Sequence, residues 1–140
     1  MITGAHLLLY SADPDADRAF FRDVLGFRSV DAGGGWLIFA LPPSEAALHP
    51  DDEERRLAHG GHQLLGAVLY LMCDDLRAQV AALAARRVGC TGIEEEPWGL
   101  RTTIRLPSGG EIGLYQPTHP TPLAGRSSLT LDQRNADPAG

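Results

Sequence analysis

Residues 68–89 read VLYLMCDDLRAQVAALAARRVG, and this stretch decides the fold because a strand, a helix start and a helix end follow one another directly. Its first six residues are apolar or favour strands and contain no breaker, which predicts a buried strand. Asp74 or Asp75 then offers a side-chain oxygen to the free N–H groups of a helix start. Apolar positions recur at helical spacing over 76–88, and Gly89 follows, as is typical of a helix end.

The same order occurs once before in the chain. A strand candidate at 6–10 precedes Asp13, which predicts the cap of a helix over 14–25 with a proline at its first position. Trp36 in the first half corresponds to Trp98 in the second, at a spacing of about 62 residues. Two copies are too few for a solenoid, so the pattern predicts one α+β domain with internal two-fold pseudosymmetry.

Each half is expected to follow the order β-α-β-β-β. The first half would contain strands at 2–10, 27–30, 36–41 and 45–49 around its helix, and the second would contain strands at 68–73, 90–93, 100–106 and 111–115. The wholly apolar strand at 36–41 is expected to be buried on both faces, and residues 94–97 are expected to form a turn. The domain boundaries follow: a first βαβββ module at 1–50, a linker at 51–66, a second module at 67–117, and a polar, disordered tail at 118–140.

The predicted linker combines a charged run with His59 and His62, which flank two glycines. The charged run is typical of a solvated turn or short helix. A metal pair formed by the two histidines is disfavoured, because metal sites need ligands that are held in place.

Composition excludes several classes of function. The 140 residues are 44% hydrophobic, enough for the core of one compact domain, and the formal net charge of −6 argues against binding to nucleic acid or to an anionic membrane surface. We expect a cytoplasmic protein, because we find neither a long apolar run nor a basic leader. Cys73 and Cys90 lack metal-binding spacing, which favours reduced thiols and leaves a disulfide between them open.

Several short motifs together resemble the vicinal oxygen chelate superfamily, which includes glyoxalase I, bleomycin-resistance proteins and extradiol dioxygenases. These motifs are His6 on the first strand, Asp13 before the first helix, Phe20-Phe21 and Leu25-Gly26-Phe27 near its end, Asp74-Asp75-Leu76 before the second helix, and LPSGGEIGLYQP at 106–117. The resemblance covers about residues 2–117. It implies that the paired modules form a half-open β-barrel cleft, in which the enzymes of the family hold a divalent metal.

The resemblance assigns four ligand positions to this chain, and the chain departs from most of them. His6 matches the first-strand ligand. Val68 stands where the second module usually has a histidine, Gly113 where the last strand usually has a glutamate, and Ala46 at the fourth position. Valine and glycine side chains carry no donor atoms, and a single imidazole does not hold a catalytic metal. We therefore expect no metal site and no cofactor, although a divalent metal on a displaced set of His6, Glu45 and Glu111 is conceivable.

Alternation along the strands predicts which side chains face the cleft. The predicted ligand pocket comprises His6, Leu8, Tyr10, Val68, Tyr70, Met72, Trp98, Glu111, Gly113 and Tyr115. Its walls would be apolar with few polar groups, as in sites for small molecules, and Gly113 would leave room for a ligand. Core packing is an equally good interpretation of Tyr70 and Met72.

Three functions remain open at this point. The first is a metal-free protein, similar to the bleomycin-resistance branch, that binds a small aromatic or amphipathic molecule. The alternative is a divalent-metal-dependent lyase, isomerase or dioxygenase with a non-standard ligand set around His6. A metal-free enzyme that uses His6 or Tyr115 as acid or base has no support beyond the presence of these groups, so the catalytic residues are unknown. The resemblance also implies a homodimer.

Overall fold

The structure is a computed structural model of the chain, and it describes residues 1–123. Contacts divide the chain into two compact units. Of the described residues, the first unit comprises 1–42 and 105–111, and the second comprises 43–104 and 112–123. This division does not follow the boundaries expected from the repeat, so the module limits at 50 and 67 stay a prediction.

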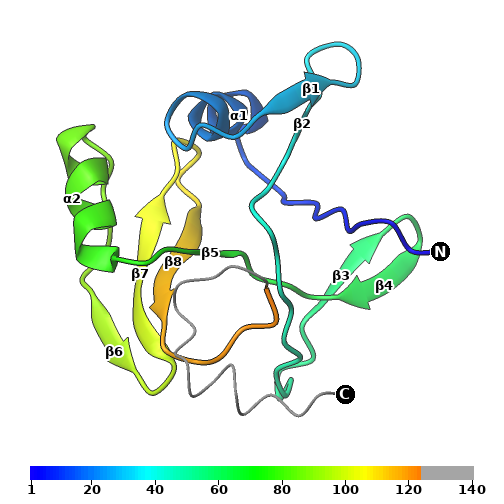
Figure 1. Cartoon of the computed structure of the whole chain (residues 1–140). Coiled ribbons are helices and arrows are strands. Elements are labelled where there is room, and N and C mark those ends of the chain that lie inside the picture. The colour runs from blue at the N-terminus through cyan, green and yellow to red at the C-terminus, as the bar shows by residue number, and fades with distance from the viewer. Residues whose placement is uncertain (124–140) are drawn as a thin grey trace. The chain divides into compact units, whose positions relative to one another are not determined.

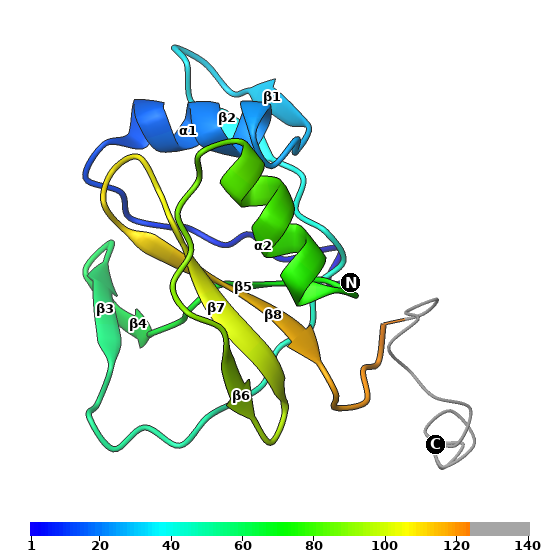
Figure 2. The same ribbon diagram turned by 90° about the vertical axis from the view of Figure 1, so that its left-hand side faces the viewer.

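The second unit is built on a four-stranded sheet with the order β5-β8-β7-β6. Its strands are β5 (Tyr70–Met72), β8 (Glu111–Pro117), β7 (Gly99–Arg105) and β6 (Glu94–Glu96). Strand β5 runs parallel to β8, and β6 runs antiparallel to β7. Helix α2 (Leu76–Ala85) lies against this sheet (Figures 1 and 2). The predicted strands at 68–73, 100–106 and 111–115 are thus confirmed, the first in shorter form.

Helix α2 begins where the sequence predicts it. The Asp75 carboxylate accepts a hydrogen bond from the Ala78 N–H at 3.0 Å and so satisfies one free donor of the first turn. Leu76 is fully buried, and Leu83 two turns later is nearly so. The helix ends earlier than predicted, because Arg87 already adopts the left-handed conformation, with φ of 62°.

Two predictions in this half are wrong. Residues 94–97 were expected to form a turn, but Glu94 to Glu96 pair with β7 as strand β6. Glutamate favours strands poorly, and here Arg101 on β7 forms ion pairs with both Glu94 and Glu96 across the strands. The predicted strand at 90–93 reduces to a single bridge between Cys90 and Ile104.

The expected linker at 51–66 contains a β-hairpin. Strands β3 (Arg56–His59) and β4 (His62–Leu65) pair antiparallel, with His59 opposite His62. The hairpin forms because Gly60 and Gly61 both adopt positive φ angles, 58° and 82°, which suit a two-residue hairpin turn. The charged run before it is exposed and contains a turn at residues 52–53, as the prediction of a solvated turn requires. Every residue of the hairpin is exposed.

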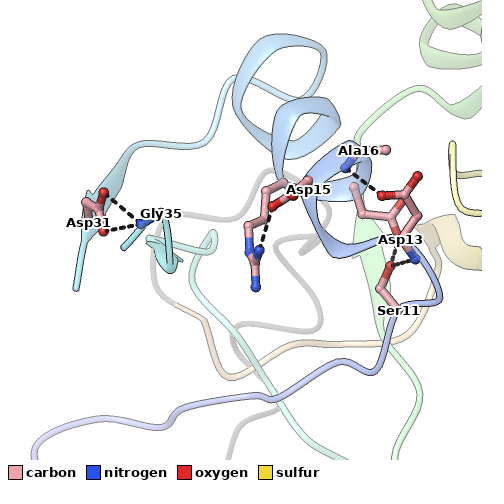
Figure 3. A network of polar contacts seen from close by, with 8 residues as sticks. Ser11, Asp13, Asp15, Ala16, Asp31 and Gly35 are labelled. Atoms are coloured by element: carbon pink, nitrogen blue, oxygen red, sulfur yellow. Dashed lines mark hydrogen bonds and ion pairs between the residues drawn. The ribbon is translucent and has the colours of Figure 1, made fainter. Parts of the chain in front are cut away.

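The first unit contains helix α1 (Pro14–Asp23). Asp13 caps it, and its carboxylate accepts a hydrogen bond from the Ala16 N–H at 3.3 Å, as Figure 3 shows. The helix predicted over 14–25 is confirmed, with Val24 as its C-cap. Like α2 it is ten residues long, and no helix within residues 1–123 has the length and apolar character needed to cross a membrane.

A buried carboxylate on α1 holds two other segments of the first unit. Asp17 is 8% exposed and accepts a hydrogen bond from the Ser11 hydroxyl at 2.6 Å. It also accepts one from the Ser108 N–H at 3.0 Å, in the turn between β7 and β8. These two hydrogen bonds offset the free-energy cost of burying the Asp17 carboxylate.

The remaining strands of the first unit form a small hairpin. Strand β1 (Ser29–Asp31) pairs with β2 (Leu37–Phe39). In the turn between them the Asp31 carboxylate accepts a hydrogen bond from the Gly33 N–H, and another from the Gly35 N–H, which Figure 3 shows. The expectation that the strand at 36–41 is buried on both faces is wrong, because Trp36 is 53% exposed and Ile38 is 37% exposed.

Two predicted strands of the first half do not form. Residues 2–10 and 45–49 have no regular secondary structure. A strand needs a hydrogen-bonding partner, and in the described part of the chain no strand pairs with either segment. The apolar run at 7–10 is consequently between 39% and 63% exposed.

The expected disordered tail starts at residue 118, yet residues 118–123 are tied to other parts of the second unit. The Thr118 N–H donates to the Trp98 carbonyl at 3.0 Å, and Thr121 is 7% exposed. The remainder of that predicted tail, 124–140, lies outside the described residues.

Candidate functional site

Three aromatic rings meet in the second unit. Tyr70 comes from β5, Tyr115 from β8 and Trp98 from the turn between β6 and β7. Their centroids are 5.2 to 6.0 Å apart and each pair is close to perpendicular, the edge-to-face arrangement that aromatic rings prefer. Tyr115 is buried, whereas Trp98 is 36% exposed. This aromatic triad therefore has one buried ring, that of Tyr115, a half-buried ring, that of Tyr70, and an exposed ring, that of Trp98.

Gly113 forms the floor beneath one ring of the triad. It lies opposite Tyr70 in the parallel register of β5 and β8. A Cβ at residue 113 would lie far inside contact distance of the Cδ1 atom of Tyr70. The Tyr70 ring thus occupies the space that any side chain at position 113 would need.

A cation borders the triad, and two carboxylates balance its charge. The Arg101 guanidinium donates to Glu96 and to Glu94, each at 2.9 Å. The hydrogen bond to Glu96 is the main cause that raises the pKa of Arg101, helped by the charges of both glutamates and by a hydrogen bond with Tyr70, while burial opposes the rise. Arg101 is therefore engaged within the protein, and the sheet holds it beside the triad.

A polar network continues from the buried end of the triad. The Tyr115 hydroxyl lies 2.9 Å from Nε2 of His119, and Glu45 Oε2 lies 3.9 Å from the same nitrogen. The Thr121 hydroxyl donates to the other oxygen of Glu45 at 2.5 Å. Sequence reasoning missed His119 and Thr121, because a Pro- and Thr-rich segment resembles a tail. The prolines on both sides of this segment, which restrict the backbone, were the available signal.

The predicted pocket residues fall into both units. Tyr70, Trp98, Gly113 and Tyr115 come together as described, and Met72 lies opposite Tyr115 in the strand register. Val68 precedes β5 in the same unit and is 81% exposed.

The other four predicted residues belong to the first unit. Leu8 and Tyr10 are 39% and 63% exposed, in the same irregular segment as the exposed His6. Glu111 lies 3.9 Å from Arg105. The ten-residue pocket as a whole stays a prediction.

The residues present do not fit the divalent metal that the resemblance implies. Val68 and Gly113 offer no donor atoms, and the Tyr70 ring covers Gly113. Within residues 1–123, no three His, Cys, Asp or Glu side chains are grouped so that they could hold a metal ion. Cys73 and Cys90 are not joined by a disulfide, which answers the question that their spacing left open.

Comparison with known families agrees with the α+β fold. The family model described as the Glyoxalase/Bleomycin resistance protein/Dioxygenase superfamily matches residues 4–114. The chain belongs to this superfamily. None of the curated proteins matches it.

Solved structures of the same fold include proteins of different activities. TnmS3, an antibiotic binding protein from Streptomyces sp. CB03234, is 24% identical with a TM-score of 0.53, over 84% of this chain and 99% of that one. Lactoylglutathione lyase from Agrobacterium tumefaciens is 23% identical with a TM-score of 0.55, over 81% and 92%. At this level of identity, the likeness establishes the α+β fold.

Proposed function

We propose that the protein binds a small aromatic or amphipathic molecule at the aromatic triad, without a catalytic metal. The observation that carries this proposal is the Tyr70 ring lying on Gly113. At the position where the resemblance places a metal-binding glutamate, this chain has an aromatic surface instead. Aromatic walls with a few polar groups are typical of small-molecule sites.

Exposure and polarity support the same assignment. Trp98 presents a third of its surface at the edge of the triad, and tryptophan is a common anchor for flat ligands. Polar groups border the rings, because His119 contacts the Tyr115 hydroxyl and Arg101 hydrogen-bonds Tyr70, which suits an amphipathic ligand. The fold is compatible with binding as well as with catalysis, since it is found both in an antibiotic binding protein and in a lyase.

The test is ligand binding by paired tryptophan variants. Planar aromatic compounds, with anilinonaphthalene sulfonate as the first probe, are titrated while the melting temperature and the tryptophan fluorescence are recorded. Bound ligand stabilises the native state, so we expect a higher melting temperature, and Trp98→Ala should reduce the affinity by at least about tenfold. Trp36→Ala is the matched control, because Trp36 corresponds to Trp98 in the repeat and lies outside the triad.

A metal-retention experiment separates metal-free ligand binding from metal-dependent catalysis. The protein is incubated with zinc, nickel, manganese and ferrous iron, dialysed, and analysed for retained metal. We expect no stoichiometric metal. One equivalent retained by the wild type and lost in His6→Ala would overturn the metal-free assignment, and a ligand panel without any effect on the melting temperature would overturn binding itself.

We further propose that the protein is a homodimer. The apolar run at residues 7–10 is exposed and has the composition of a strand without forming one. Exposed apolar runs of this kind mark interaction surfaces, and an extended segment gains hydrogen bonds when it joins a sheet. Sedimentation of the wild type at several concentrations tests this proposal, with a constant monomer mass as the contradicting result.

A further inference from the structure

The hydrogen bonds around His119 define which of its nitrogens carries the proton. Nδ1 lies 2.8 Å from the carbonyl oxygen of Pro120, and a carbonyl only accepts. Nδ1 of the neutral ring must therefore carry the hydrogen. Nε2 then has the lone pair, so the Tyr115 hydroxyl donates to it across 2.9 Å. The ring presents a basic nitrogen at the end of the aromatic triad.

A carboxylate stands beside that nitrogen. Glu45 Oε2 lies 3.9 Å from Nε2, and its other oxygen accepts the Thr121 hydroxyl. The Leu123 N–H in turn donates to the Thr121 hydroxyl oxygen at 3.2 Å. A fixed carboxylate at this distance balances the positive charge that the ring acquires when Nε2 takes up a proton.

Solvent reaches this group together with the accessible ring of the triad. The side chains of His119 and Glu45 are 29% and 20% exposed, and Trp98 is 36% exposed. Tyr115 contacts both ends, with ring centroids 5.2 Å from Trp98 and 5.9 Å from His119. Because the Tyr115 ring is itself buried, a ligand ring on the exposed part of Trp98 would bring a substituent to Nε2 by passing the edge of Tyr115.

We propose that His119 accepts a proton from the ligand, and that the ligand class is phenols, that is, aromatic molecules with an acidic hydroxyl group. The proposal rests on the proposed function and names its ligand. The ligand O–H bond breaks and the proton forms an N–H bond at Nε2, while Tyr115 turns its hydroxyl hydrogen from Nε2 to the phenolate oxygen. The neutral ring and neutral phenol become an imidazolium and a phenolate, so net charge is conserved. Tyr115 and Glu45 are positioning residues.

The probe for this step is 4-nitrophenol, because its phenolate absorbs visible light and its neutral form does not. We expect the bound probe to ionise about one pH unit lower than the free probe, the size of effect that a nearby opposite charge produces. His119→Gln should abolish this shift. Glu45→Gln should reduce it, and His62→Gln on the exposed β3–β4 hairpin should leave it unchanged. Circular dichroism of each variant establishes that it is folded.

The methyl ether 4-nitroanisole separates aromatic binding from proton transfer to His119, because it has the same ring without an ionisable hydroxyl group. Binding of both probes with unshifted ionisation of 4-nitrophenol would overturn the role of His119 and leave aromatic binding standing. The role of His119 is equally overturned if folded His119→Gln and Glu45→Gln both retain the full shift. If neither probe quenches Trp98 fluorescence in the wild type, both the phenol assignment and the proposed function fail.

Discussion

In the second half of the repeat, the strand before the helix pairs with the last strand of the same half, whereas the corresponding segments of the first half form no strand. Strand β5 lies parallel to β8. Residues 6–10 and 45–49, their counterparts, have no regular structure. Both halves nevertheless form a ten-residue helix with an aspartate cap. Helices need only local hydrogen bonds, while strands need a partner, so one sequence pattern has two outcomes.

The largest effect we expect from this difference concerns buried leucines. Leu76→Ala removes a fully buried side chain and should lower the free energy of unfolding by about 2–5 kcal/mol. Leu8→Ala, in the irregular counterpart, removes a side chain that is 39% exposed and should cost the monomer about 1 kcal/mol or less. Urea denaturation of dilute protein measures both. If both variants lost the same free energy of unfolding, Leu8 would have to be buried as well. The two halves would then not differ in the way that the structure shows.

The parts of the fold that could be read from the sequence are those with local causes. Asp13 and the pair Asp74-Asp75 indicated both helix starts, although the choice of Asp75 as the cap came from the structure, and the alternation from residue 100 indicated β7. Gly113 was expected to leave room for a ligand, but the chain's own Tyr70 ring takes that room. Pairing across β5 and β8 creates this contact, and no spacing along one strand reveals it. Glu45 and His119 also meet from segments more than 70 residues apart in the chain, a contact that no local sequence pattern reveals.

Substitution of the two N-cap residues tests whether the helix starts of the two halves contribute equally to stability. Asp75→Ala and Asp13→Ala each remove a carboxylate that accepts the N–H three residues on, at 3.0 and 3.3 Å. Each should cost about 1 kcal/mol of stability. Asp74→Ala is the matched control beside the second cap and should change stability by less than about 0.5 kcal/mol. Thermal unfolding monitored by circular dichroism gives these values, and a cap that matters in only one half would contradict local equivalence.

The smallest effect concerns the residues that follow the two corresponding glycines of the repeat, Gly26 in the first half and Gly89 in the second. These residues are Phe27 and Cys90. Both are half-buried, and Phe27 packs on Phe21. At the cysteine, burial raises the pKa of the thiol above its ordinary value of 9.0. The folded thiol therefore holds its proton more tightly than the unfolded one. Its contribution to stability is complete below the unfolded pKa and is lost as the pH rises through the folded pKa.

Alkylation measures this shift directly, because the thiolate is the reactive form. In a Cys73→Ser background, iodoacetamide should modify Cys90 several-fold more slowly in the native protein than in urea at pH 8, by about the ratio of the thiolate fractions. The native rate should continue to rise at a pH where the rate in urea has levelled off. A native rate equal to the rate in urea across the pH range would mean that the Cys90 thiol is as exposed as the irregular segment at residues 7–10. Burial of the residue after the glycine would then not be shared by the two halves.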